Sequence, residues 1–136
     1  MTNVSALNDQ TFISQFEACT LDPKHFDHLG HIRLGWLYAT QNALPDAISK
    51  TCDGIQRFAG SLGAHDKFHY TLTEAFVRLI ALRQAESPAI SFDQFLNQNT
   101  DLVDNALNLI HQHYSEALLA TNDAKRHSVV ADLLPI

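Results

Sequence analysis

The stretch "FDHLGHIRLGWLYA", residues 26–39, decides the fold because its apolar residues recur at helical spacing. On a helical wheel of about 100° per residue, His28 lies near the middle of the apolar arc and His31 lies on the next ridge. Arg33 falls on the opposite side, and Gly35, one turn after the histidines, leaves room beside them for a partner or a ligand. We therefore predict a helix that turns both histidines toward the core.

Helical periodicity continues on both sides of this stretch, and alternating runs of Val, Ile and Thr are absent. We expect residues 1–136 to form one all-α domain, a compact bundle of about five to six helices with short connections. In chain order, the expected helices are one after the Asn8-Asp9 cap with Phe12, Phe16 and Cys19 on one face, one from Asp22 or Asp27 to about Asn42, one from Pro45 to Gly60 or Gly63, one from Asp66 to about Ala85, a short one after Ser91, one from about Leu102 to Leu119 with a break near Ser115, and a last turn after Thr121.

The charge balance and the cysteines narrow the class of protein. Nine basic and fifteen acidic residues give a net charge of -6, which argues against a nucleic-acid partner or an anionic membrane surface. No apolar run approaches the ~18 residues of a membrane span, and the polar N-terminus predicts no signal peptide. Cys19 and Cys52 are best explained as reduced thiols in a cytoplasmic protein. Leu37, opposite the core stripe, leaves a helix-packed homo-oligomer open.

Eight histidines are many for a chain of this length, and three of them are expected to face the core. In the helix predicted from Asp66, His69 falls inside the apolar arc, with Thr73 one turn later, whereas Thr71 and Glu74 fall on the opposite face. Burying an imidazole without a hydrogen bond costs on the order of 1–3 kcal/mol. We therefore expect the side chains of His28, His31 and His69 to need partners, which can be one another.

This convergence predicts a metal site. Two histidines at i and i+3, His28 and His31, can share a metal ion, and His69 from a facing helix would supply a third nitrogen. Glu17 is the candidate fourth, carboxylate ligand, and such a ligand set suits zinc or iron. An open coordination position would make the protein a small metalloenzyme.

Two other interpretations of the same histidines stay open. One is a pocket without metal, in which His69, Lys67 and Thr73 contact a small-molecule ligand, with Lys67 reaching an anionic group at the helix N-terminus. The other is a purely structural network of hydrogen bonds. The sequence contains no P-loop, no dinucleotide-binding glycine pattern and no G-x-S-x-G motif, so no catalytic residue is assigned.

Two motifs resemble a family of small bacterial helical proteins of uncharacterised activity. The family pattern is F-x-H-x-x-H-[LI]-R followed later by K-[YF]-H-x-T-[LI]-T, and an acidic residue is typical at the position of Glu17. The matching residues of this chain are Phe26, His28, His31 and Arg33 in the first motif, and Lys67, His69, Thr71 and Thr73 in the second. The similarity covers nearly the whole chain, although Ala131-Asp132 stands where Pro-Asp is typical. The resemblance singles out the same residues and implies no reaction.

Overall fold

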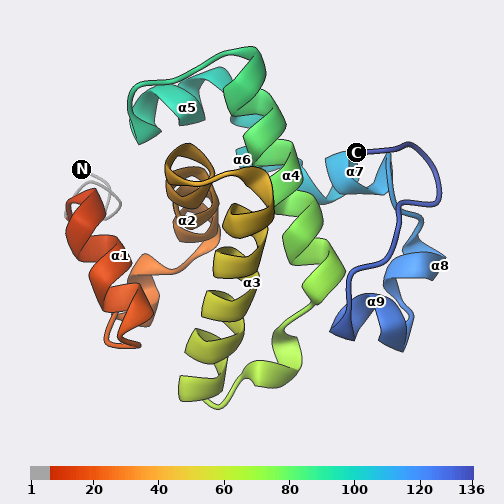
Figure 1. The fold of residues 1–136 in the computed structure, drawn as a ribbon, viewed down its shortest axis with the longest axis horizontal. Coiled ribbons are helices and arrows are strands. Elements are labelled where there is room, and N and C mark those ends of the chain that lie inside the picture. The colour runs from red at the N-terminus through yellow and green to blue at the C-terminus, as the bar shows by residue number, and fades with distance from the viewer. Residues whose placement is uncertain (1–6) are drawn as a thin grey trace.

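The fold is built on three helices, α2, α3 and α4, which pack against one another. The computed structural model describes residues 7–136, and within that range every regular element is a helix (Figure 1), so the expected all-α class is confirmed. The elements are α1 (Asp9–Glu17), η2 (Pro23–His25), α2 (His28–Gln41), α3 (Leu44–Ser61), η3 (His65–Lys67), α4 (Tyr70–Glu86), α5 (Phe92–Gln98), α6 (Thr100–Asp104), α7 (Ala106–His111), α8 (Glu116–Leu119) and α9 (Asn122–Arg126), where η marks a 3-10 turn.

Helix α2 is buried on all sides along its middle. Its first turn is capped by Asp27, whose carboxylate accepts a hydrogen bond from the Gly30 N–H at 2.9 Å. Asp22 caps the separate turn η2, so both expected caps are used, each for its own element. Every residue from 32 to 38 is buried, and Leu37 is only 3% exposed. Leu37 therefore packs inside the chain and gives no surface for a homo-oligomer.

Glycines allow the central helices to approach closely. A Cβ added to Gly35 would lie 2.8 Å from the Ile80 Cδ1 atom of α4, and one added to Gly54 of α3 would lie 2.6 Å from the Phe16 ring of α1. Both distances are well inside van der Waals contact, so a larger residue at either position would have to displace the neighbouring side chain. The space predicted beside Gly35 is thus partly taken by Ile80.

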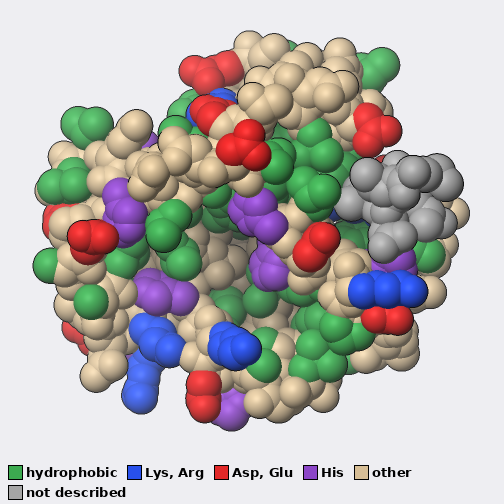
Figure 2. Space-filling view, turned by 180° about the vertical axis from the view of Figure 1, so that it is seen from behind, with side chains coloured by type: hydrophobic (Ala, Val, Ile, Leu, Met, Phe, Trp, Pro, Cys, Tyr) green, Lys and Arg blue, Asp and Glu red, His purple; other side chains and the backbone are tan. Residues whose placement is uncertain are grey.

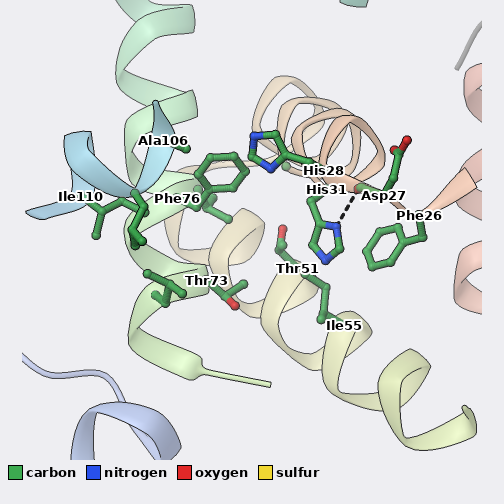
Figure 3. A pocket seen from close by; sticks show the side chains of 14 residues that line it. Phe26, Asp27, His28, His31, Thr51, Ile55, Thr73, Phe76, Ala106 and Ile110 are labelled. Atoms are coloured by element: carbon green, nitrogen blue, oxygen red, sulfur yellow. Dashed lines mark hydrogen bonds between the residues drawn. The ribbon is translucent and has the colours of Figure 1, made fainter. Parts of the chain in front are cut away.

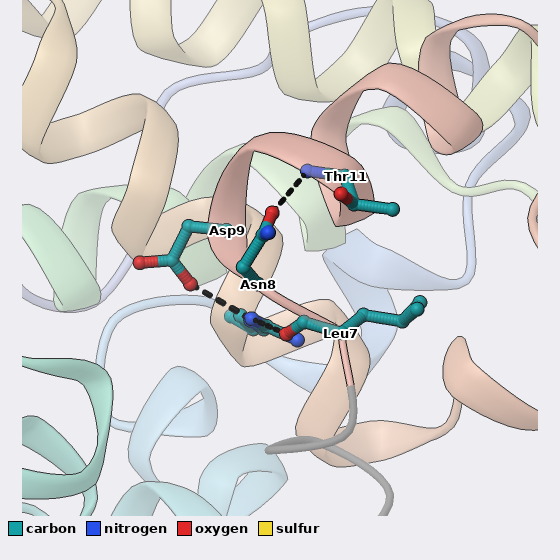
Figure 4. Close-up of polar contacts among 5 residues, drawn as sticks. Leu7, Asn8, Asp9 and Thr11 are labelled. Atoms are coloured by element: carbon teal, nitrogen blue, oxygen red, sulfur yellow. Dashed lines mark hydrogen bonds and ion pairs between the residues drawn. The ribbon is translucent and has the colours of Figure 1, made fainter.

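Helix α1 covers the side of α2 that carries Arg33. Figure 4 shows the start of α1, with Leu7, Asn8 and Asp9. The sequence placed Arg33 opposite the core, but its side chain is buried. Its Nη2 atom lies 2.8 Å from an Asp9 carboxylate oxygen and donates to the Leu7 carbonyl at 2.6 Å, and its guanidinium lies over the Phe12 ring. The expected Asn8 cap is confirmed, since its side chain accepts from the Thr11 N–H. The prediction for Arg33 was wrong because a helical wheel of α2 does not show that another helix, α1, packs against this side.

Helix α4 begins later than the sequence indicated. The predicted cap Asp66 lies in η3, and the N-cap is His69, whose backbone is extended. The face that holds Thr71 and Glu74 is also buried, because α9 packs against α4 and the chain after it crosses the helix. Thr71 donates to the His127 carbonyl at 2.6 Å, which fixes this crossing.

The segment predicted as one helix from Leu102 to Leu119 is three short ones, α6, α7 and α8. Asn105, whose φ of -144° and ψ of 26° are not helical, separates α6 from α7. The bend allows α6 to contact α2 while α7 contacts α4. Cys19 is outside α1, at a left-handed φ of 59°. Among residues 7–136, no helix combines the length and the apolar character that crossing a membrane requires.

Candidate functional site

A cavity of about 470 Å³ lies between α2, α3, α4 and α7, and it is mainly apolar. In Figure 2 histidine side chains gather at a hollow in one face of the molecule, and Figure 3 shows the residues around the cavity. This volume is within the range of about 300–1,000 Å³ that is typical of small-molecule sites. The lining residues are Phe26, Asp27, His28, His31, Gly35, Thr51, Ile55, Leu72, Thr73, Phe76, Val77, Ala106, Leu107 and Ile110.

His31 is held in the cavity wall by two contacts. Its Nδ1–H donates to the Asp27 backbone carbonyl at 2.8 Å, and its ring stacks on Phe26 with 4.0 Å between the centroids. Burial lowers the pKa of His31, and the nearby His28 ring adds to this, against the opposing effect of the Asp27 carbonyl. Because a carbonyl can only accept, the proton is on Nδ1, and Nε2 of the neutral ring keeps a lone pair.

His28 lies at the rim of the same cavity. Its Nε2–H donates to the Leu102 carbonyl at 3.0 Å, which links α2 to α6. The His28 ring also lies against Phe76 of α4, with 5.8 Å between the centroids. His28 and His31 therefore line one cavity, but His28 is exposed at its rim and is not buried in the core as the wheel predicted.

His69 lies outside this cavity, and both its ring nitrogens have partners. Nδ1 accepts from the Leu72 N–H at 3.0 Å, and Nε2–H donates to the Leu119 carbonyl at 2.8 Å. The ring thus caps α4 and ties its start to α8. The expected convergence of His69 with the other two histidines was wrong, because the wheel was extended past the first residue of the helix.

The structure places the remaining predicted site residues at different distances from the cavity; they are Glu17, Lys67 and Thr73. Glu17 accepts a hydrogen bond from the Tyr38 hydroxyl at 2.7 Å, away from the cavity. Lys67 lines a neighbouring hollow of about 190 Å³ that shares His31 with the main cavity. Thr73 lines the main cavity itself, and its predicted contact with a ligand stays a prediction. Of the six predicted site residues, His28, His31 and Thr73 therefore come together.

The predicted zinc or iron site requires several metal-ligating side chains close together. Within residues 7–136, no three His, Cys, Asp or Glu side chains are grouped so that they could hold a metal ion. His69 and Glu17 are the two predicted ligands that lie elsewhere. Metal binding by this protein stays a prediction.

The sequence analysis did not predict that Thr51 and residues of α7 line the cavity. Thr51 carried a usable signal, since it is a polar residue in the apolar stripe of α3, four residues from both Ala47 and Ile55. No comparable signal marks Ala106 or Ile110, because the bend at Asn105 brings α7 against α4.

Comparison with protein-family models, curated proteins and solved structures finds no match for this chain. The resemblance to the family with two histidine motifs therefore stays a prediction.

Proposed function

We propose that the cavity between α2, α3, α4 and α7 binds a small, largely apolar molecule without a metal ion. The observation that carries this proposal is a cavity of about 470 Å³ whose apolar wall includes two histidine rings anchored by backbone carbonyls. Apolar walls with a few well-placed polar groups are characteristic of small-molecule sites.

The histidines support binding rather than packing alone. A leucine at the position of His31 would line the same wall without the desolvation of an imidazole. His31 keeps an unprotonated nitrogen that has no hydrogen bond to residues 7–136 and is not buried. A ligand in the cavity could donate a hydrogen bond to this nitrogen in place of solvent.

The proposal also assigns the other predicted ligand-binding residues. Thr73 lies in the wall of the main cavity, so it contacts the bound molecule. Lys67 lines the neighbouring hollow and contacts only a ligand that reaches past His31. His69 takes no part in binding, because its two ring nitrogens hold Leu72 and Leu119.

A thermal-shift screen of small apolar molecules tests the proposal. A ligand at ten times its Kd stabilises a protein by about 1.4 kcal/mol, which is about 5 °C for a domain of this size. Ala106→Phe places a ring in the cavity wall and should abolish the shift. Ala117→Phe, at an exposed position in α8, is the matched control and should keep it. A library that gives no shift with the wild type, or equal shifts with Ala106→Phe, contradicts the proposal.

A further inference from the structure

The hydroxyl protons of the two threonines in the cavity wall are already used. Thr51 donates its hydroxyl proton to the Ala47 carbonyl at 2.7 Å, and Thr73 donates to the His69 carbonyl at 2.8 Å. A hydroxyl has one proton and two lone pairs. Both threonine oxygens can therefore only accept a hydrogen bond from a molecule in the cavity.

The two histidines repeat this pattern. His31 gives its Nδ1 proton to the Asp27 carbonyl, and His28 gives its Nε2 proton to the Leu102 carbonyl. Burial lowers the pKa of His31, so its Nε2 is left as an acceptor. Nδ1 of His28 is an acceptor in the tautomer whose Nε2–H donates to Leu102. Figure 3 shows these rings on α2 and Thr51 and Thr73 on α3 and α4, around the same cavity.

The rest of the wall adds no side-chain donor. Among the lining residues, Asp27 is the other polar side chain, and its carboxylate also accepts, from the Gly30 N–H. No lysine or arginine lines the main cavity, and the chain has a net charge of -6. A carboxylate placed there would lose its water without gaining a cation or a side-chain donor, which is costly.

We propose that the cavity selects an apolar molecule that carries N–H or O–H donors, such as an aryl or alkyl amine or alcohol, and rejects carboxylates. This inference rests on the proposed function and adds the chemical class of the ligand. Its basis is that Thr51, Thr73, His28 and His31 have all given their protons to backbone carbonyls.

Indole and benzofuran are suitable probes, because they have nearly the same bicyclic shape but indole alone has a donor. One hydrogen bond to a protein acceptor should make indole bind roughly three- to tenfold more tightly, as measured by calorimetry or NMR titration. Benzofuran-2-carboxylate should bind more weakly than benzofuran. Equal binding of indole and benzofuran, or preferred binding of the carboxylate, overturns the inference and leaves the proposed function intact. Failure of both neutral probes to bind counts against the proposed function as well.

Substitutions locate the acceptors. His31→Phe keeps a ring against Phe26 and removes Nε2, whereas Thr73→Val removes one hydroxyl at constant shape. At least one of them should reduce the preference for indole to less than twofold while benzofuran binds as before. Thr40→Val is the matched control, since Thr40 also donates to a backbone carbonyl, that of Leu37, but is outside the cavity. A full indole preference in both folded variants, checked by circular dichroism, overturns the inference.

Discussion

His69 offers the sharpest test of how this fold uses its histidines. Its ring makes two bonds, accepting from the Leu72 N–H at 3.0 Å and donating to the Leu119 carbonyl at 2.8 Å. Loss of an N-cap acceptor costs about 1 kcal/mol, and loss of a hydrogen bond to a carbonyl costs about 1 kcal/mol. His69→Ala should therefore lower the free energy of unfolding by about 2 kcal/mol.

His69→Asn separates the two bonds. Asparagine is a good N-cap residue, so its side-chain oxygen should still accept from the Leu72 N–H. It is too short to replace the bond to Leu119, so the expected loss is about 1 kcal/mol. Urea unfolding followed by circular dichroism measures both values, and melting should fall by about 4 °C per kcal/mol.

His65, an exposed histidine near the start of α4, provides the control for these His69 variants. His65→Ala changes an exposed histidine in η3 and should alter stability by less than about 0.5 kcal/mol. Equal losses for His69→Ala and His69→Asn would show that the ring does not cap α4. Zinc titration of the same variants adds a second readout. Because His69 lies outside the cavity of His28 and His31, His69→Asn should leave zinc affinity unchanged, and a drop would restore the three-histidine metal site.

Three further predictions concern buried ionisable groups. Burial lowers the pKa of His31, so the unfolded chain binds a proton more readily than the folded chain. The free energy of unfolding should therefore fall as the pH drops below about 6.5. His31→Phe should weaken this acid dependence, as measured by urea unfolding at several pH values. Burial, reinforced by the Glu74 carboxylate, raises the pKa of the Cys52 thiol to about 12. A disulfide reagent at pH 8 should therefore label the half-buried Cys19 in the folded protein and Cys52 only after unfolding. Rapid labelling of Cys52 in the folded protein would contradict this. Arg33→Ala should lower the free energy of unfolding by about 3 kcal/mol and Asp9→Ala by about 1–2 kcal/mol. The reason is that the Arg33 side chain is 5% exposed, whereas that of Asp9 is 53% exposed. The reverse order in chemical denaturation would refute the burial argument.

Local signals in the sequence predicted the helices well where a short side chain caps them. Asn8, Ser91 and Thr121 each accept a hydrogen bond from the backbone N–H three residues later, at the helix starts that the sequence indicated. The wheel also placed His31 correctly on the inward side of α2, whereas His28, predicted to face the core, is exposed. Caps and periodicity depend on residues within a few positions of one another, so one sequence contains all the information that they need.

The same reasoning failed at positions where a distant segment decides. His69 was assigned to a helix face, but the helix starts one residue later, and the Leu119 carbonyl holds the ring from fifty positions away. Arg33 and Glu74 were expected opposite the core, but α1 covers the first and the C-terminal helices cover the face that carries the second. Charged residues that pair inside the fold give the same wheel pattern as residues in water.

The sequence by itself thus determined the all-helical class, most of the caps, and the inward direction of His31. The tertiary structure decided which polar groups share a cavity, and it also decided which protons remain available there. A ring nitrogen or hydroxyl presents a lone pair only after its proton has been given to a particular backbone carbonyl. For His28 that carbonyl belongs to Leu102, and its position follows from how α6 packs on α2.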